Sequence, residues 1–117
     1  MKNTIQNVHG VKIGDIFYTS WGYDQTNIDY FEVVAVTAKM ATVKPIESMR
    51  TETDFLQGIT YPVPGAYIIG GFHADIIKTQ TDDWGDGPRL KNADGCKSSK
   101  HIGYPYKGQE VRYSQYA

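Results

Sequence analysis

The sequence contains one cysteine, three histidines and no long hydrophobic run among its 117 residues. Cys96 has no second thiol for an internal disulfide, which is typical of a reducing compartment. No apolar stretch approaches the ~20 residues that a membrane-spanning helix needs, and residues 1–8 lack the apolar segment of a secretion signal. We therefore expect a protein of the cytoplasm that needs no disulfide and contacts no membrane.

The sequence patterns of common catalytic sites are also absent. His9, His73 and His101 are too far apart along the chain for their spacing to indicate a zinc site. There is no Gly-x-Ser-x-Gly turn for a serine nucleophile and no glycine-rich loop for a phosphate. The sequence therefore predicts no catalytic residue, no metal and no cofactor, and it favours a protein that is not an enzyme.

The composition is that of one folded unit. Hydrophobic residues make up 40% of the chain and aromatic residues 13%, which is enough for a core and unlike a disordered protein. A chain of this length buries roughly two-thirds of its unfolded surface in a single core. We therefore expect a single domain over residues 1–117.

Short runs of branched and aromatic residues predict strands at 11–19, 29–38, 41–46, 66–72 and 75–79. The turn at Lys107 and Gly108 predicts a final hairpin that pairs residues 104–106 with 110–116. Residues 47–58 fit a loop or one helical turn, and residues 82–88 fit an exposed loop. The fold class is therefore mainly β, with at most a short helix.

Many short strands with closely spaced turns favour a small, strongly bent antiparallel barrel of five to seven strands. The length suggests the Src-homology-3-like kind of barrel, with loop insertions at 47–60 and 80–103. In such a barrel the first two strands are joined by a long loop at the barrel mouth. In this sequence that loop is residues 20–28.

The loop combines two large rings with donors and acceptors, and this mixture is typical of a binding surface. Its candidate binding residues are Trp21, Tyr23, Asp24, Gln25, Thr26 and Asn27. The alternative is that Trp21 covers the end of the barrel as part of the core, while Asp24 and Asn27 close turns through local backbone bonds. Both roles stay open from the sequence, because a rigid loop is also a good platform.

The net charge of −1 conceals a gradient along the chain. Residues 1–86 carry 6 Lys and Arg against 11 acids, whereas residues 87–117 carry 6 against 2. The cations of the second part could contact phosphates if the fold brings them to one face, although a scattered, solvated distribution is the simpler alternative. They are Arg89, Lys91, Lys97, Lys100, Lys107 and Arg112.

Five segments together resemble a known group of proteins. They are KIGDIFYTSWGYDQTNIDYFEVVAV, KPI, YPVPGAYIIG, RLKNADG and YPYKGQEVRYSQYA. The chain is similar to a family of small uncharacterised proteins encoded in phages, prophages and other mobile elements, most strongly over residues 12–46 and 104–117. The family has no defined activity, so the resemblance implies only a phage or mobile-element setting in a bacterial host.

Two functions of different classes follow from these observations. The first is stoichiometric recognition of a host protein, for example by an anti-CRISPR or anti-restriction inhibitor. The second is a nucleic-acid-binding module, in which the loop rings stack on bases and the basic segment neutralises phosphates. A third, weaker hypothesis is a toxin-like nuclease, because Gly14 and Asp15 open the first strand as in toxin ribonucleases of this barrel class, although the arginine-proline segment that usually follows is missing.

Overall fold

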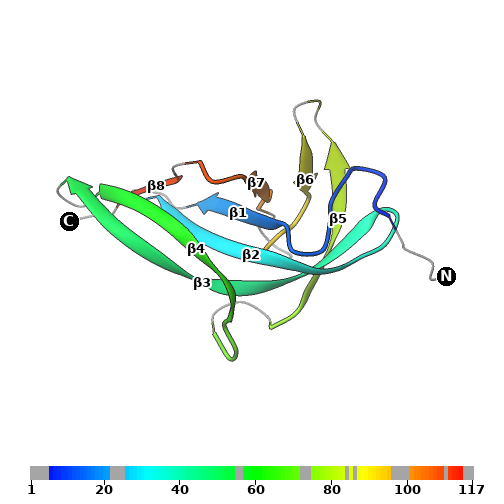
Figure 1. The fold of residues 1–117 in the computed structure, drawn as a ribbon, viewed down its shortest axis with the longest axis horizontal. Helices are drawn as coiled ribbons and strands as arrows, with labels where there is room; N and C mark the ends of the chain where they lie inside the picture. The colour runs from blue at the N-terminus through cyan, green and yellow to red at the C-terminus, as the bar shows by residue number, and fades with distance from the viewer. Residues whose placement is uncertain are drawn as a thin grey trace.

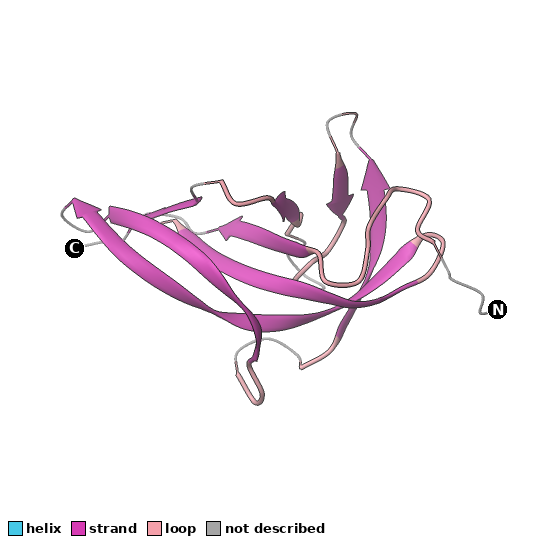
Figure 2. Ribbon diagram, viewed as in Figure 1, coloured by secondary structure: helices cyan, strands magenta, loops and turns pink. Residues whose placement is uncertain are grey.

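The computed structural model describes residues 6–21, 26–54, 57–71, 75–83, 85, 87–95, 101–109 and 111–114. Within these ranges the chain forms eight β-strands and no helix (Figure 1). They are β1 (Ile16–Trp21), β2 (Asn27–Val36), β3 (Met40–Asp54), β4 (Gln57–Tyr67), β5 (Ile77–Asp83), β6 (Pro88–Leu90), β7 (Tyr104–Tyr106) and β8 (Val111–Ser114). Figure 2 shows strands joined by loops throughout the described chain. The predicted mainly β fold is confirmed, and no described segment has the helical length and hydropathy that crossing a bilayer requires.

The strands form one strongly curved antiparallel arrangement. The hydrogen-bonded order is β6-β5-β3-β2-β1-β7, while β4 pairs with the far part of β3 and carries β8. Among the described residues, β6 and the segment before β7 meet at one bridge, where Leu90 and Gly103 exchange backbone hydrogen bonds of 3.0 and 2.8 Å. The sheet curls toward a barrel without closing into one, so the barrel prediction is only partly confirmed.

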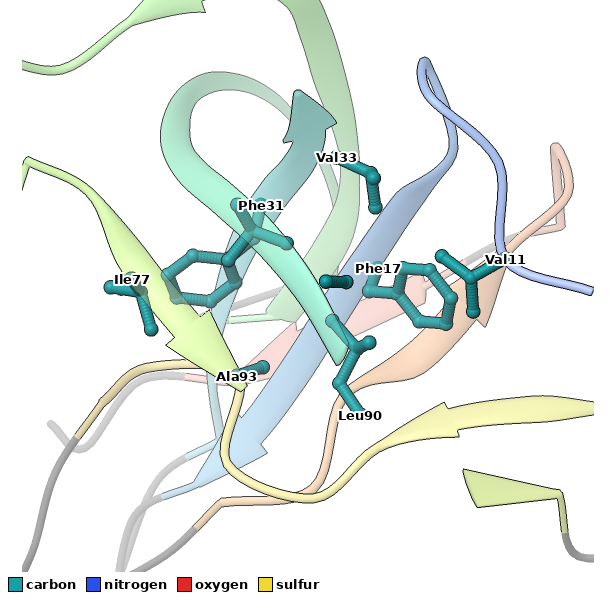
Figure 3. Packing of buried hydrophobic residues seen from close by; sticks show 9 residues of the cluster. Val11, Phe17, Phe31, Val33, Ile77, Leu90 and Ala93 are labelled. Atoms are coloured by element: carbon teal, nitrogen blue, oxygen red, sulfur yellow. The ribbon is translucent and has the colours of Figure 1, made fainter. Parts of the chain in front are cut away.

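One core lies inside the curled sheet, and we call it the barrel core. Alternate residues of a strand point to opposite faces, and Phe17 of β1 faces inward with Phe31 and Val33 of β2. Figure 3 shows these side chains gathered with Ile77 and Leu90 from the other side of the curl. The barrel core consists of Val11, Phe17, Phe31, Val33, Ala41, Val43, Ile77, Leu90 and Ala93.

A second core covers the outer face of β1 and β2. The far part of β3 and the first part of β4 form a long hairpin, residues 47–54 and 57–62, which we call the arm (Figure 1). It brings β8 across Ile28 and Tyr30 of β2, whose side chains point away from the barrel core. This arm core consists of Ile28, Tyr30, Ile46, Val111 and Tyr113, with Ile16, Tyr18 and Tyr106 packed against it. The central strands are therefore covered on both faces.

The prediction of a loop or helical turn at 47–58 is wrong, because β3 continues as a strand to Asp54. It passes through Pro45, a residue type that usually lies at a strand end or a sheet edge. Pro45 lies where β3 changes partner, from β5 at Val43 to β4 at Ile46. Its carbonyl accepts a hydrogen bond from the Ile68 backbone N–H at 2.9 Å. The N–H that proline lacks would point to the same side of β3, where β3 passes from one partner strand to the next. A proline there removes no ladder bond.

The predicted hairpin between residues 104–106 and 110–116 is also wrong. Strand β7 pairs with β1, and β8 pairs with β4. The Gln109 side chain bonds to the backbone of Lys107 and Pro105 at 2.5 and 3.0 Å and closes a turn that leads the chain away. Tyr113 then packs over Gly58, where an added Cβ would lie 2.6 Å from the ring. Long-range packing of the tyrosines overrides the local hairpin signal.

The other strand boundaries differ in detail. Strand β1 begins at Ile16 because the residues before it form a turn, in which Gly14 has a φ of 96° and Asp15 accepts a bond from the Lys12 N–H at 2.9 Å. Strand β4 ends at Tyr67 and not at residue 72. Strand β5 extends to Asp83, into the segment predicted as an exposed loop.

Candidate functional site

The loop predicted at residues 20–28 is shorter in the structure, because Ser20 and Trp21 belong to β1 and Asn27 and Ile28 belong to β2. These strand ends lie at one end of the curled sheet, which we call the barrel mouth. Trp21 is the last residue of β1 and is half-buried. Its indole Nε1 donates a hydrogen bond of 2.7 Å to Asp29 Oδ2 on β2. Its ring centroid lies 6.1 Å from that of His101, with the planes tilted by 39°. The indole is thus held by partners from within the protein while part of its surface stays accessible.

The remaining loop residues are only partly visible. Thr26 and Asn27 are half-buried, and Asn27 is the register partner of Trp21 across β1 and β2. Tyr23, Asp24 and Gln25 lie outside the described residues. The structure therefore places Trp21, Thr26 and Asn27 together at the strand ends, and the binding role predicted for the loop stays a prediction.

The mouth contains an acid and a histidine that the sequence did not bring together. Asp94 lies in the turn after β6 with its side chain 4% exposed, and its Oδ2 bonds to Nδ1 of His101, whose side chain is 26% exposed. A backbone bond of 3.0 Å from Ala93 N–H to the His101 carbonyl holds the two segments side by side. The sequence analysis did not pair Asp94 with His101, which lie seven positions apart along the chain.

A second candidate surface lies on the outer face of β1, where four tyrosine rings pack in a row. The Tyr18 and Tyr104 centroids are 5.7 Å apart, Tyr18 and Tyr30 are 6.2 Å apart, and Tyr30 meets Tyr106 edge-on at 5.7 Å. Tyr30 is buried and its hydroxyl contacts Thr60 Oγ1 at 2.5 Å. Burial raises the pKa of Tyr30 to about 12, although the bond to Thr60 opposes this shift. Tyr30 is therefore a neutral support behind the outer rings.

Two open hollows adjoin this row of rings. One, of about 380 Å³, lies toward Arg89 and Lys107, and the other, of about 360 Å³, lies toward Ser20 and Arg112. Tyr18 and Tyr104 line both, so the two hollows form a continuous surface that we call the tyrosine groove. Its residues are Tyr18, Ser20, Ile28, Arg89, Tyr104, Pro105, Lys107, Gln109, Val111 and Arg112.

The tyrosine groove gathers half of the six cations predicted as phosphate contacts. The Arg89 guanidinium lies over the Tyr104 ring at 5.1 Å from its centroid, while Lys107 and Arg112 are exposed at the groove wall. The described lining residues include these three cations and no acid. Lys91 is exposed and does not line the groove, and Lys97 and Lys100 lie outside the described residues. The cations thus meet on one face with tyrosines in place of the predicted Trp21.

The sequence predicted Tyr18 and Tyr104 only as strand residues. A usable signal was present, because strict alternation in β1 places Tyr18 opposite to the inward Phe17. Tyr104 precedes Pro105, and proline in a strand is typical of a sheet edge, where flanking rings remain accessible. What the sequence could not show is that β7 pairs with β1 and so joins the two rings.

The described residues offer no site for a metal ion. No three His, Cys, Asp or Glu side chains among them come close enough to share one. The Thr19 hydroxyl, on the inward face of β1, is buried without a hydrogen-bond partner in the described part of the chain. The functional groups that the described residues offer are therefore aromatic rings, cations and the pair of Asp94 with His101.

Comparison with known proteins adds no relative to this picture. No family model, no curated protein and no solved structure matches the chain. The resemblance to phage and mobile-element proteins therefore stays a prediction.

Proposed function

We propose that this protein binds single-stranded nucleic acid in the tyrosine groove. The observation that carries the proposal is the convergence of Arg89, Lys107 and Arg112 around the stacked Tyr18 and Tyr104 rings. Sequence-tolerant binding of single strands needs flat rings on which bases stack and cations that follow the backbone phosphates. The groove supplies both, and the cations come from three separate strands or loops.

The shape of the groove suits a flexible strand better than a duplex. Its two hollows lie on either side of the Tyr18 and Tyr104 ring pair, so a strand crossing it would pass one base into each. Stacking requires bases that are free of a partner strand, and no described helix is available to enter a major groove. The buried Tyr30 packs against Tyr18, and Tyr18 packs against Tyr104, so the ring pair is supported before a ligand arrives.

Binding should be modest and strongly dependent on salt. The net charge is −1, so attraction to phosphates must come from the local cations and not from the whole chain. If three phosphates are neutralised, the slope of log K against log salt is about −2 for a single strand, at ~0.7 per contact. Fluorescence anisotropy of labelled 12-nucleotide strands between 25 and 200 mM salt measures this slope. Absence of binding at 25 mM salt contradicts the proposal.

Recognition of a host protein remains a second proposal, and the arm supports it. Met49 on β3 and Tyr61 on β4 are register partners, and they are 64% and 41% exposed. Exposed apolar pairs of this kind are typical of contact surfaces between proteins. In a phage setting, the partner would be a factor of bacterial defence in the host cytoplasm.

A paired capture experiment tests this second proposal. Tagged wild-type protein and the M49D/Y61D variant are incubated with bacterial lysate, and retained proteins are identified by mass spectrometry. The proposal requires a protein that the wild type retains, the variant loses, and the purified wild type binds again in a one-to-one complex. A capture profile shared by both proteins contradicts an arm-mediated contact.

A further inference from the structure

We propose that the pair of Asp94 and His101 at the barrel mouth is the general base of an RNA-cleaving site, acting on a strand held in the tyrosine groove. This inference rests on the proposed function, because the groove must first bind the strand. It also goes beyond that function, because binding alone leaves the pair without a role. His101 is the catalytic residue in this scheme, and Asp94 is a positioning residue.

The geometry of the pair fits proton transfer at one atom of the imidazole. The Asp94 carboxylate is nearly fully buried and bonds to His101 Nδ1, while the histidine side chain is 26% exposed. A carboxylate at Nδ1 fixes the ring orientation and favours the tautomer that carries its proton there. Nε2 is then the nitrogen that can accept a proton from a ligand. The carboxylate also stabilises the imidazolium that this transfer creates.

Trp21 gives the histidine a flat neighbour that a base can stack against. Its ring lies 6.1 Å from the His101 ring and is fixed by the 2.7 Å bond from Nε1 to Asp29. A half-buried indole in this position exposes part of an apolar surface beside the imidazole ring. The base stacking that was predicted for the loop at residues 20–28 would thus place a nucleotide at His101.

The mouth lies within reach of the tyrosine groove. Tyr18 and Tyr104 are register partners on β1 and β7, and Trp21 and His101 each lie three residues further along the same two segments. Three extended residues span about 10 Å. Trp21 points to the face of β1 opposite Tyr18, so a strand of a few nucleotides that occupies the hollow beside Ser20 must turn over the end of β1 to reach the mouth.

The reaction class is transesterification at an RNA phosphodiester. The proton of a ribose 2′-OH moves to His101 Nε2, and the 2′-oxygen forms a bond to the adjacent phosphorus. The bond between phosphorus and the 5′-oxygen breaks, its electron pair stays on that oxygen, and the oxygen takes a proton from water. The histidine then returns its proton to the hydroxide left behind. The products are a 2′,3′-cyclic phosphate end and a 5′-OH end, and no metal or other co-reactant is consumed.

The test uses the whole protein with matched RNA and DNA strands of one sequence, in the presence of EDTA. Wild-type protein should cleave the RNA to a cyclic phosphate end and leave the DNA intact, since DNA lacks the 2′-OH. His101→Gln should lower the cleavage rate by about 100-fold or more, the contribution of a general base. Asp94→Asn should lower it and change the pH profile of the rate. Thermal melts of both variants measure whether they remain folded.

The outcomes separate this inference from the proposed function. RNA that stays intact while the DNA strand binds overturns the inference and leaves nucleic-acid binding in place. Absence of binding to either strand overturns both. Cleavage that persists in equally purified His101→Gln protein assigns the activity to another source and overturns the inference. If the variants unfold in thermal melts, the wild-type protein still tests the inference. It must cleave the RNA to a cyclic phosphate end and leave the DNA intact.

Discussion

The barrel mouth and the tyrosine groove hold similar kinds of side chain but use them differently. At the mouth, Trp21 is bonded to Asp29 and lies against His101, so its partners come from the protein itself. In the groove, Tyr18 packs against the buried Tyr30 and against Tyr104, and the Tyr18 and Tyr104 rings border two open hollows. The comparison indicates that an accessible ring needs a buried support. It also indicates that the loop predicted from the sequence at residues 20–28 is not the most open surface of the described chain.

The charges separate the two regions in the same way. The described charged groups at the mouth include Asp29 and Asp94, both engaged in internal contacts. The described groove lining has three cations and no acid. Among the described residues, a polyanion should therefore be attracted to the groove more than to the mouth, as the proposed function requires.

Reversing groove charge should have the largest effect. Lys107→Glu with Arg112→Glu should weaken binding of a single strand by about 100-fold at low salt and reduce the salt slope by about 1.4, because two phosphate contacts are lost. Both residues are exposed, so the thermal midpoint should barely change. Anisotropy titrations measure the affinity and slope.

Lys91→Glu is the matched control for this charge reversal. It reverses the charge of one exposed cation of residues 87–117 that does not line the groove. It should alter the affinity for the strand less than threefold. Equal losses in the control and in the groove variant would mean that general charge, and not the groove, attracts the ligand.

Removing the indole should affect the fold more than groove affinity. Trp21→Ala loses a half-buried ring and its bond to Asp29, so the free energy of unfolding should fall by about 2 kcal/mol. Denaturant titration measures this change. A short DNA strand should still bind within threefold of the wild-type affinity, because the groove is intact. A stable variant that no longer binds would indicate that the predicted loop is the primary binding site, and it would contradict the assignment of binding to the tyrosine groove.

Removing an outer tyrosine should have the opposite pattern. Tyr104→Ala removes one stacking face and the surface under Arg89, so affinity should fall by about tenfold, within the ~1–3 kcal/mol that a stacked base contributes. The ring is half-buried on the short edge strand β7, so the loss of stability should be smaller than for Trp21→Ala. Tyr67→Ala, which removes an exposed ring outside the groove, is the control and should bind normally.

The sequence predicted the strands with strong alternation and missed the arrangements that depend on distant pairing. Residues 29–38 correspond closely to β2, because Phe31 and Val33 on one face and Tyr30 on the other leave no helical alternative. The arm was missed because charged and polar residues in β3 conceal a strand that is held by β4. The groove was missed for the same reason, since it joins β1 to β6, β7 and β8. Local pattern determines an element, while long-range register determines a site.

The smallest expected effect concerns the buried support of the groove. Tyr30 is neutral in the fold with a pKa of about 12, above its ordinary value of 10.0, because burial disfavours the phenolate. A raised pKa stabilises the fold fully below pH 10, and this contribution is lost as the pH rises from 10 toward 12, when the unfolded chain ionises first. The free energy of unfolding should therefore fall by about 1 kcal/mol more in the wild type than in Tyr30→Phe over that interval. Denaturant titrations at pH 9, 10.5 and 11.5 measure both proteins. Parallel pH curves would show that Tyr30 already ionises freely, and the groove would then lack the neutral, buried support that distinguishes it from the mouth.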